Sequence, residues 1–145
     1  TLRQAWAVGE DGTILRYESG SWQAETSGTN EDLYAVAMRD SNNDGLADEG
    51  WAVGKKGIAI HIVRVLGGYN FSTVSTPHNK NIEGIVMLAS NDVWAVGKYG
   101  KLIHWNGSAW SEVTSPTGRK LNAIAMVGKP GQNGLVAGTW HEVIA

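Results

Sequence analysis

Residues 40–49 carry the side chains with the clearest chemical potential in this sequence. Oxygen-bearing side chains stand at the first, third, fifth and ninth positions of this segment, and a glycine stands at the sixth. Alternate residues of a tightly curved loop point inward, the glycine permits the sharp bend, and the seventh residue can add a main-chain carbonyl oxygen. The spacing therefore predicts a calcium ion held by the side chains of Asp40, Asn42, Asp44 and Asp48 and by the carbonyl of Leu46.

A solvated turn is the alternative, because Asp, Asn and Gly are also the residues that turns prefer. Against it, four acidic residues stand close together in the segment and would repel one another without a cation: Asp40, Asp44, Asp48 and Glu49. We expect calcium to play a structural role by ordering the loop, so its removal should lower the thermal midpoint.

The elements that must position this loop are repeated along the chain. The phrase Trp-Ala-Val-Gly occurs at residues 6–9, 51–54 and 94–97, and a worn copy follows at 135–138. The glycines that end these phrases are separated by steps of 45, 43 and 41 residues. This period is typical of one four-stranded blade of a β-propeller.

Three further phrases repeat in register with the first one. A Leu/Ile-x-x-Val/Ile-x-Met phrase precedes it, an apolar phrase follows it, and an aromatic residue comes last at Trp22, Phe71 and Trp110. Each phrase is rich in β-branched or aromatic residues and is bounded by turn residues, so each is predicted to be a strand. The chain is therefore predicted to be all-β, with about fourteen strands in antiparallel four-stranded sheets. The repeats span 1–32, 33–81, 82–120 and 121–145, and the recurring large residues are predicted to be buried between blades: Trp6, Trp51, Trp94, Met38, Met87 and Met126.

This organisation resembles the Asp-box and photosystem II assembly factor type of β-propeller repeat. In that type the second strand often reads Trp-Ala-Val-Gly, and a short Gly-rich turn precedes the fourth strand. The turns at 18–22, 66–71 and 106–110 are degenerate versions of it. The acidic segment lies between the first and second strands of its blade, where it resembles the calcium loops of integrin-type FG-GAP propellers.

The predicted strands do not fill whole blades. The chain starts in the second strand of one blade and ends in the third strand of another, which gives about three and a half blades, whereas propellers close with 4 to 8. We therefore expect a single propeller segment of a larger ring, completed by further blades in the same chain or in a second chain.

The composition of the chain disfavours some classes of function. The chain has 145 residues, a formal net charge of -2 and no cysteine, and 42% of it is hydrophobic. The balance of charge disfavours non-specific nucleic-acid binding, and no apolar run reaches the roughly 20 residues that span a bilayer. His61 and His104 share one repeat position, so we expect exposed strand residues rather than catalytic ones.

Catalytic residues are not apparent. The five arginines share no inner-strand position, and most acidic residues belong to the loop or to hairpins. The sequence favours a non-catalytic, calcium-stabilised propeller that binds a protein or glycan partner and is secreted or cell-surface. The alternative is a segment of a propeller glycoside hydrolase or sialidase-like enzyme whose catalytic residues lie outside it.

Overall fold

The computed structural model describes residues 4–127. Helical structure in this range is confined to three short 3-10 turns, η1 (Glu10–Gly12), η2 (Lys55–Gly57) and η3 (Lys98–Gly100). None of the described helices is long and apolar enough to cross a membrane.

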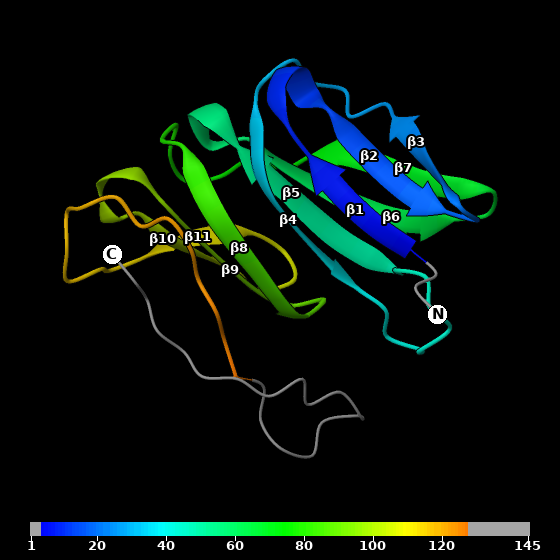
Figure 1. The fold of residues 1–145 in the computed structure, drawn as a ribbon. Helices are drawn as coiled ribbons and strands as arrows, with labels where there is room; N and C mark the ends of the chain where they lie inside the picture. Colours follow the sequence, from blue (N-terminus) through cyan, green and yellow to red (C-terminus); the bar gives the residue numbers. More distant parts are fainter. Residues whose placement is uncertain (1–3, 128–145) are drawn as a thin grey trace.

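The strands form three antiparallel sheets that follow one another along the chain (Figure 1). Each sheet is a meander, in which consecutive strands pair, as expected for antiparallel strands joined by short turns. The first sheet has three strands, β1 (Gln4–Val8), β2 (Ile14–Glu18) and β3 (Ser21–Glu25). The second has four, β4 (Leu33–Arg39), β5 (Glu49–Gly54), β6 (Ala59–Val65) and β7 (Gly68–Thr73), and so does the third, β8 (Ile82–Ala89), β9 (Asp92–Gly97), β10 (Leu102–Trp105) and β11 (Trp110–Val113).

The sheets pack face to face as propeller blades do. The innermost strands β4 and β8 contact each other, and β1 contacts β4. Neighbouring side chains of a strand point to opposite faces of the sheet, so β5 contributes side chains to the interfaces with both the first and the third sheet. Its Trp51 and Val53 join the core shared with the third sheet, and its Ala52 joins the core shared with the first. The predicted all-β propeller fold is confirmed.

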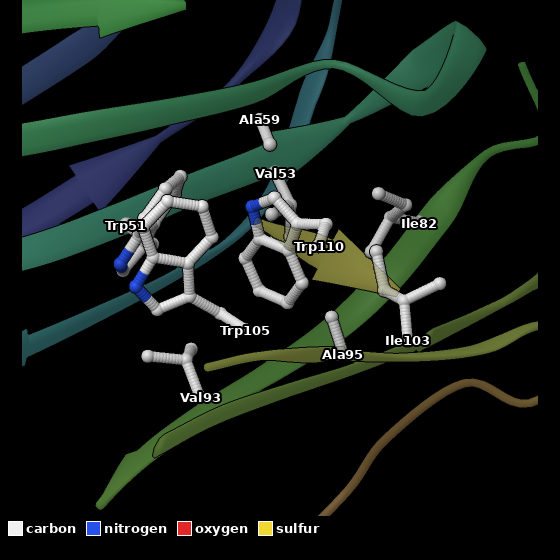
Figure 2. Packing of buried hydrophobic residues seen from close by; sticks show 9 residues of the cluster. All are labelled: Trp51, Val53, Ala59, Ile82, Val93, Ala95, Ile103, Trp105 and Trp110. Carbon is white, nitrogen blue, oxygen red and sulfur yellow. The ribbon is translucent and has the colours of Figure 1, made fainter. Parts of the chain in front are cut away.

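An aromatic cluster fills the interface between the second and third sheets (Figure 2). The ring of Trp51 lies 4.9 Å from that of Trp105 and 5.1 Å from that of Trp110. It also stacks on His61 at 4.4 Å. Trp110, the aromatic residue of the last strand of its blade, is buried in this interface as well.

Burial differs between residues that share one repeat position. Trp51 is fully buried, whereas Trp6 and Trp94 are half-buried. Trp6 packs against Tyr69 and Phe71 at the first interface. Trp94 lies on the face of the third sheet that points away from the second sheet. The three methionines Met38, Met87 and Met126 are likewise half-buried rather than buried.

The fourth repeat is described only in part. Residues 121–127 do not form a strand, although the sequence predicts one. Leu121 is nevertheless buried, and its N–H donates to the carbonyl of Gly97 at 3.0 Å, just as Leu33 donates to Gly9 at 2.9 Å. A strand needs a paired neighbour, and the phrase at 135–138 that would pair with it lies outside the described residues.

The connections between sheets are tied to the turns beside them. The N–H of Lys55 donates to the carbonyl of Asp32 at 2.8 Å, and that of Lys98 donates to the carbonyl of Asn81 at 3.0 Å. The side chain of Asp32 also accepts from the N–H of Asp11 at 3.2 Å. One residue thus joins the turns of two successive blades, which fixes how the blades sit against each other.

Candidate functional site: the acidic loop and the lysine-rich end

The loop between β4 and β5, residues 40–48, contains all five predicted calcium ligands, and we call it the acidic loop. It is held by its own main chain. The carboxylate of Asp40 accepts from the N–H groups of Asp44 at 3.3 Å and Gly45 at 2.8 Å. Asn42 Oδ1 accepts from the same Asp44 N–H at 2.9 Å, and Asp44 Oδ1 accepts from the N–H of Leu46 at 2.8 Å. The loop therefore curls around these side chains as the spacing predicts.

Asp48 closes the loop from its other end. Its Oδ2 accepts from the N–H of Ser41 at 2.8 Å and from the Ser41 hydroxyl at 2.5 Å. Glu49, which the sequence groups with the loop, instead begins β5 and lies 2.7 Å from Nε2 of His61. Among residues 4–127, no three His, Cys, Asp or Glu side chains are grouped closely enough to hold a metal ion. Calcium binding stays a prediction.

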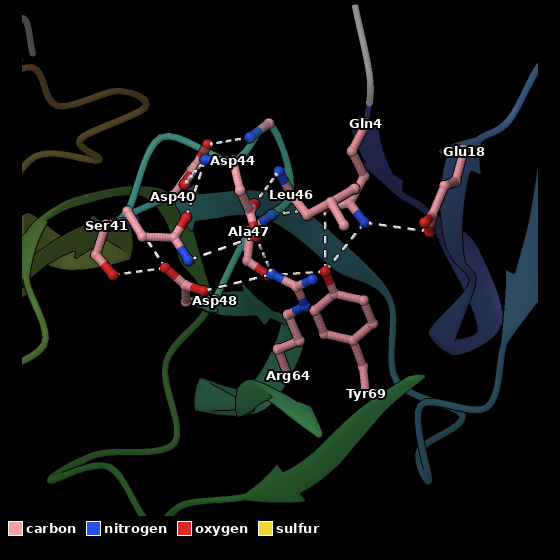
Figure 3. Close-up of polar contacts among 12 residues, drawn as sticks. Gln4, Glu18, Asp40, Ser41, Asp44, Leu46, Ala47, Asp48, Arg64 and Tyr69 are labelled. Atoms are coloured by element: carbon pink, nitrogen blue, oxygen red, sulfur yellow. Dashed lines mark hydrogen bonds and ion pairs between the residues drawn. The ribbon is translucent and has the colours of Figure 1, made fainter. Parts of the chain in front are cut away.

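Residues from other strands complete the loop's surroundings (Figure 3). Gln4 of β1 accepts from the N–H of Ala47 at 2.9 Å, and the Tyr69 hydroxyl of β7 donates to the Ala47 carbonyl at 2.7 Å. Arg64 of β6 places Nη1 2.8 Å from Asp44 Oδ2 and 3.6 Å from Asp48 Oδ1. These three residues were not singled out from the sequence, since they contact the loop only after the sheets assemble.

The electrostatics of the loop predict acid sensitivity. Hydrogen bonds from Arg64 and Leu46 lower the pKa of Asp44 below its ordinary value of 3.8, and those from Ser41 lower the pKa of Asp48. A lowered pKa means that the folded chain binds fewer protons than the unfolded chain, so this stabilisation is complete above about pH 5 and is lost as the pH falls through the folded values.

We expect the urea midpoint to fall between about pH 5 and pH 2. The fall should be smaller in Asp44→Asn, which has no carboxyl to protonate at that position. Equal falls in both proteins would show that Asp44 does not contribute.

The histidines at the shared repeat position are paired rather than exposed. His61 lies against Glu49, and His104 Nε2 lies 2.9 Å from Asp92 Oδ1. The ring of His61 also stacks on Trp51, and that of His104 lies tilted against Trp94 at 4.3 Å; both histidines are half-buried. Among the described residues no hydroxyl is hydrogen-bonded to either imidazole, so neither pair forms a Ser-His-acid arrangement.

A shallow depression of about 400 Å³ lies between the first and second sheets. The only carboxylate among the described residues that line it, that of Glu18, is ion-paired with Arg16, which also lies over the ring of Tyr69 at 5.4 Å. A glycosidase needs two suitably spaced carboxyl groups at its site. This depression does not supply them.

The opposite end of the sheets is rich in basic residues. β5 begins at the acidic loop and ends at η2, so about 20 Å separates the two ends of this strand. The turns and connections at the far end of the second and third sheets carry seven basic side chains, which we call the lysine-rich end: Lys55, Lys56, Lys80, Lys98, Lys101, Arg119 and Lys120.

Four of these side chains have acidic partners. Lys55 pairs with Asp32 and Lys56 with Glu31, Lys101 pairs with Glu112, and Lys120 pairs with Glu83. Lys80, Lys98 and Arg119 are exposed and have no ion pair within the described part of the chain. Lys80 lies over the ring of Tyr99, 5.7 Å from its centroid, and Tyr99 is 64% exposed at the tip of η3. An exposed aromatic ring among unpaired cations can contact apolar and anionic groups together.

Comparisons with known proteins support the fold. No family model matches the chain, and no curated protein matches it. A solved structure described as YCF48 bound to D1 peptide is similar over 83% of this chain, with a TM-score of 0.62 and 16% identity. YCF48 from Cyanidioschyzon merolae is similar over 86%, with a TM-score of 0.63 and 18% identity. The similar part makes up 39% and 44% of those two chains. At these identities the likeness shows the β-propeller fold alone.

Proposed function

We propose that this chain is part of a non-catalytic β-propeller that binds a protein partner, and that an acidic peptide segment docks on the lysine-rich end. The observation that carries the proposal is the exposed Tyr99 with Lys80 over its ring, at the same end of the sheets as the exposed Lys98 and Arg119. One of the similar propellers, YCF48, is described as bound to D1 peptide, which supports a peptide as the class of ligand.

Charge complementarity argues for an acidic partner. The turn of the first sheet carries Glu10 and Asp11, whereas the corresponding turn of the third carries Lys98 and Tyr99. A ligand with negative charge would therefore be steered toward the second and third sheets. An aromatic or aliphatic residue of the peptide would cover Tyr99, and acidic residues would contact Lys80 and Lys98.

The test uses the 145-residue chain and two fluorescein-labelled dodecapeptides measured by fluorescence anisotropy. One peptide contains Asp, Glu, Gly and a single Phe, and the other has Lys in place of every acidic residue. We expect saturable binding of the acidic peptide only, with weaker binding at higher salt. Lys80→Glu/Lys98→Glu should weaken it by about tenfold, because two attractive contacts become repulsive.

Asn91→Asp is the matched control, since it adds negative charge in the exposed turn between β8 and β9, at the end that also carries the acidic loop. Unchanged affinity in this control and weaker affinity in the double variant support the proposal. Equal affinity in all three proteins would overturn it. A neutral oligosaccharide that binds when the acidic peptide does not would indicate glycan recognition instead.

Calcium binding by the acidic loop and a secreted or cell-surface location are separate proposals. The curled main chain around Asp40, Asn42 and Asp44 supports the first, and isothermal calorimetry with millimolar CaCl₂ tests it. The enzyme alternative is less well supported, because the His-acid pairs and the depression described above lack a second reacting group.

A further inference from the structure

Arg64 is the one cationic side chain placed against the acidic loop in the part of the chain that the structure describes. Its Nη1 approaches Asp44 at 2.8 Å and Asp48 at 3.6 Å (Figure 3). Its main-chain N–H also donates to the carbonyl of Asp48 at 2.8 Å. Both the main chain and the side chain of this residue therefore hold the loop to β6.

An arginine at this repeat position occurs, among the three described sheets, only in the blade that has the long loop. Trp6, Trp51 and Trp94 pair with Arg16, His61 and His104, which sets the register between repeats. Three residues beyond these partners, the first and third blades have Ser19 and Gly107, whereas the second has Arg64. β6 is long enough to include Arg64, which pairs with Tyr69 of β7, while β2 and β10 end before the equivalent position.

The two carboxylate oxygens of Asp44 have different partners, and so do those of Asp48. One oxygen of Asp44 and one of Asp48 accept from main-chain N–H groups of the loop, those of Leu46 and Ser41. The other oxygen of each faces the guanidinium. A cation that neutralises both carboxylates would have to stand where this group stands.

Among residues 4–127, the carboxylates of the loop are not gathered in a group of three that could hold a metal ion by themselves. We propose that Arg64 is the resident cation of the acidic loop and orders it in the absence of calcium, so that calcium binding would require displacement of the guanidinium. A guanidinium supplies a permanent positive charge and several directed N–H donors, so it can neutralise two carboxylates and also fix their orientation. This inference is independent of peptide binding, which involves the other end of the sheets.

The test follows the loop amides by hydrogen exchange and the whole chain by differential scanning calorimetry, in EDTA and in millimolar CaCl₂. In the unaltered chain we expect protected amides at Asp44, Gly45 and Leu46 in EDTA. Arg64→Gln should raise their exchange rates by about tenfold and lower the thermal midpoint by about 2–4 °C. Arg39→Gln is the matched control, because Arg39 ends β4 beside the loop and has no ion pair within the described residues.

A double-mutant cycle separates the pair from general loosening. If Arg64 acts through Asp44, adding Arg64→Gln to Asp44→Asn should change the midpoint less than Arg64→Gln does alone. The proposal is overturned if EDTA unprotects the loop of the unaltered chain and calcium restores it. It is also overturned if Arg64→Gln leaves loop protection in EDTA unchanged.

Discussion

Replacing Gly57 by alanine is expected to lower the free energy of unfolding by about 3 kcal/mol or more, one of the two strongest effects that the fold predicts. Gly57 has a φ of +76°, which alanine adopts only with strain. A Cβ atom there would lie 2.3 Å from the carbonyl oxygen of His78 in the connection to the third sheet. Because that oxygen belongs to the main chain, relief of the overlap requires the turn and the connection to separate.

Gly28→Ala is the matched control, since Gly28 has the same φ of +76° and no atom within 4 Å of its Cβ position. It should cost only the left-handed strain, about 1–2 kcal/mol. Urea unfolding followed by far-UV circular dichroism measures both. If the two variants lost equal stability, close packing of the turn on the next blade would not be what requires glycine at position 57.

Replacing Trp51 by alanine is expected to cost about 3–5 kcal/mol. The side chain is fully buried and contacts the rings of Trp105, Trp110 and His61, so its removal leaves a cavity between two sheets that a rigid β core cannot close. Trp51→Phe retains most of the packing and should cost less, which gives a folded variant for measurement if the alanine variant does not fold.

Trp94→Ala provides the comparison within the repeat. Trp94 occupies the same position and also contacts the histidine ring of its neighbouring strand, at 4.3 Å, but it is half-buried. We expect less than half of the loss seen for Trp51→Ala, measured by guanidinium unfolding. Equal losses in the two variants would show that stacking within a blade, rather than packing between blades, accounts for the stability.

The order of the strands was predictable because their signals are local. A strand is specified by a short run of β-branched and aromatic residues, and its turn by residues such as Gly12 and Gly57, whose φ values are positive. Burial was less predictable. Trp51 and Trp94 are both followed by Ala-Val-Gly, yet they differ in what covers the sheet face on which they lie.

The candidate sites also combine features that the local sequence predicted with features that it did not predict. The spacing of Asp40, Asn42 and Asp44 predicted a loop that curls around its own side chains, because each bond spans only a few residues. Nothing near the loop in sequence indicates Arg64, whose contact with Asp44 spans 20 residues. The lysine-rich end was also missed, since its cations come from turns and connections far apart in the chain.

The sequence by itself therefore determined the strands, the turns and the propeller repeat, because strand periodicity and turn preference act over a few residues. Only the tertiary structure decided which tryptophan is fully buried, which cation neutralises the acidic loop, and that one end of the sheets is basic. Each of these depends on side chains that share no local signal and that meet only when the sheets stack, so the energy that favours them comes from contacts between blades.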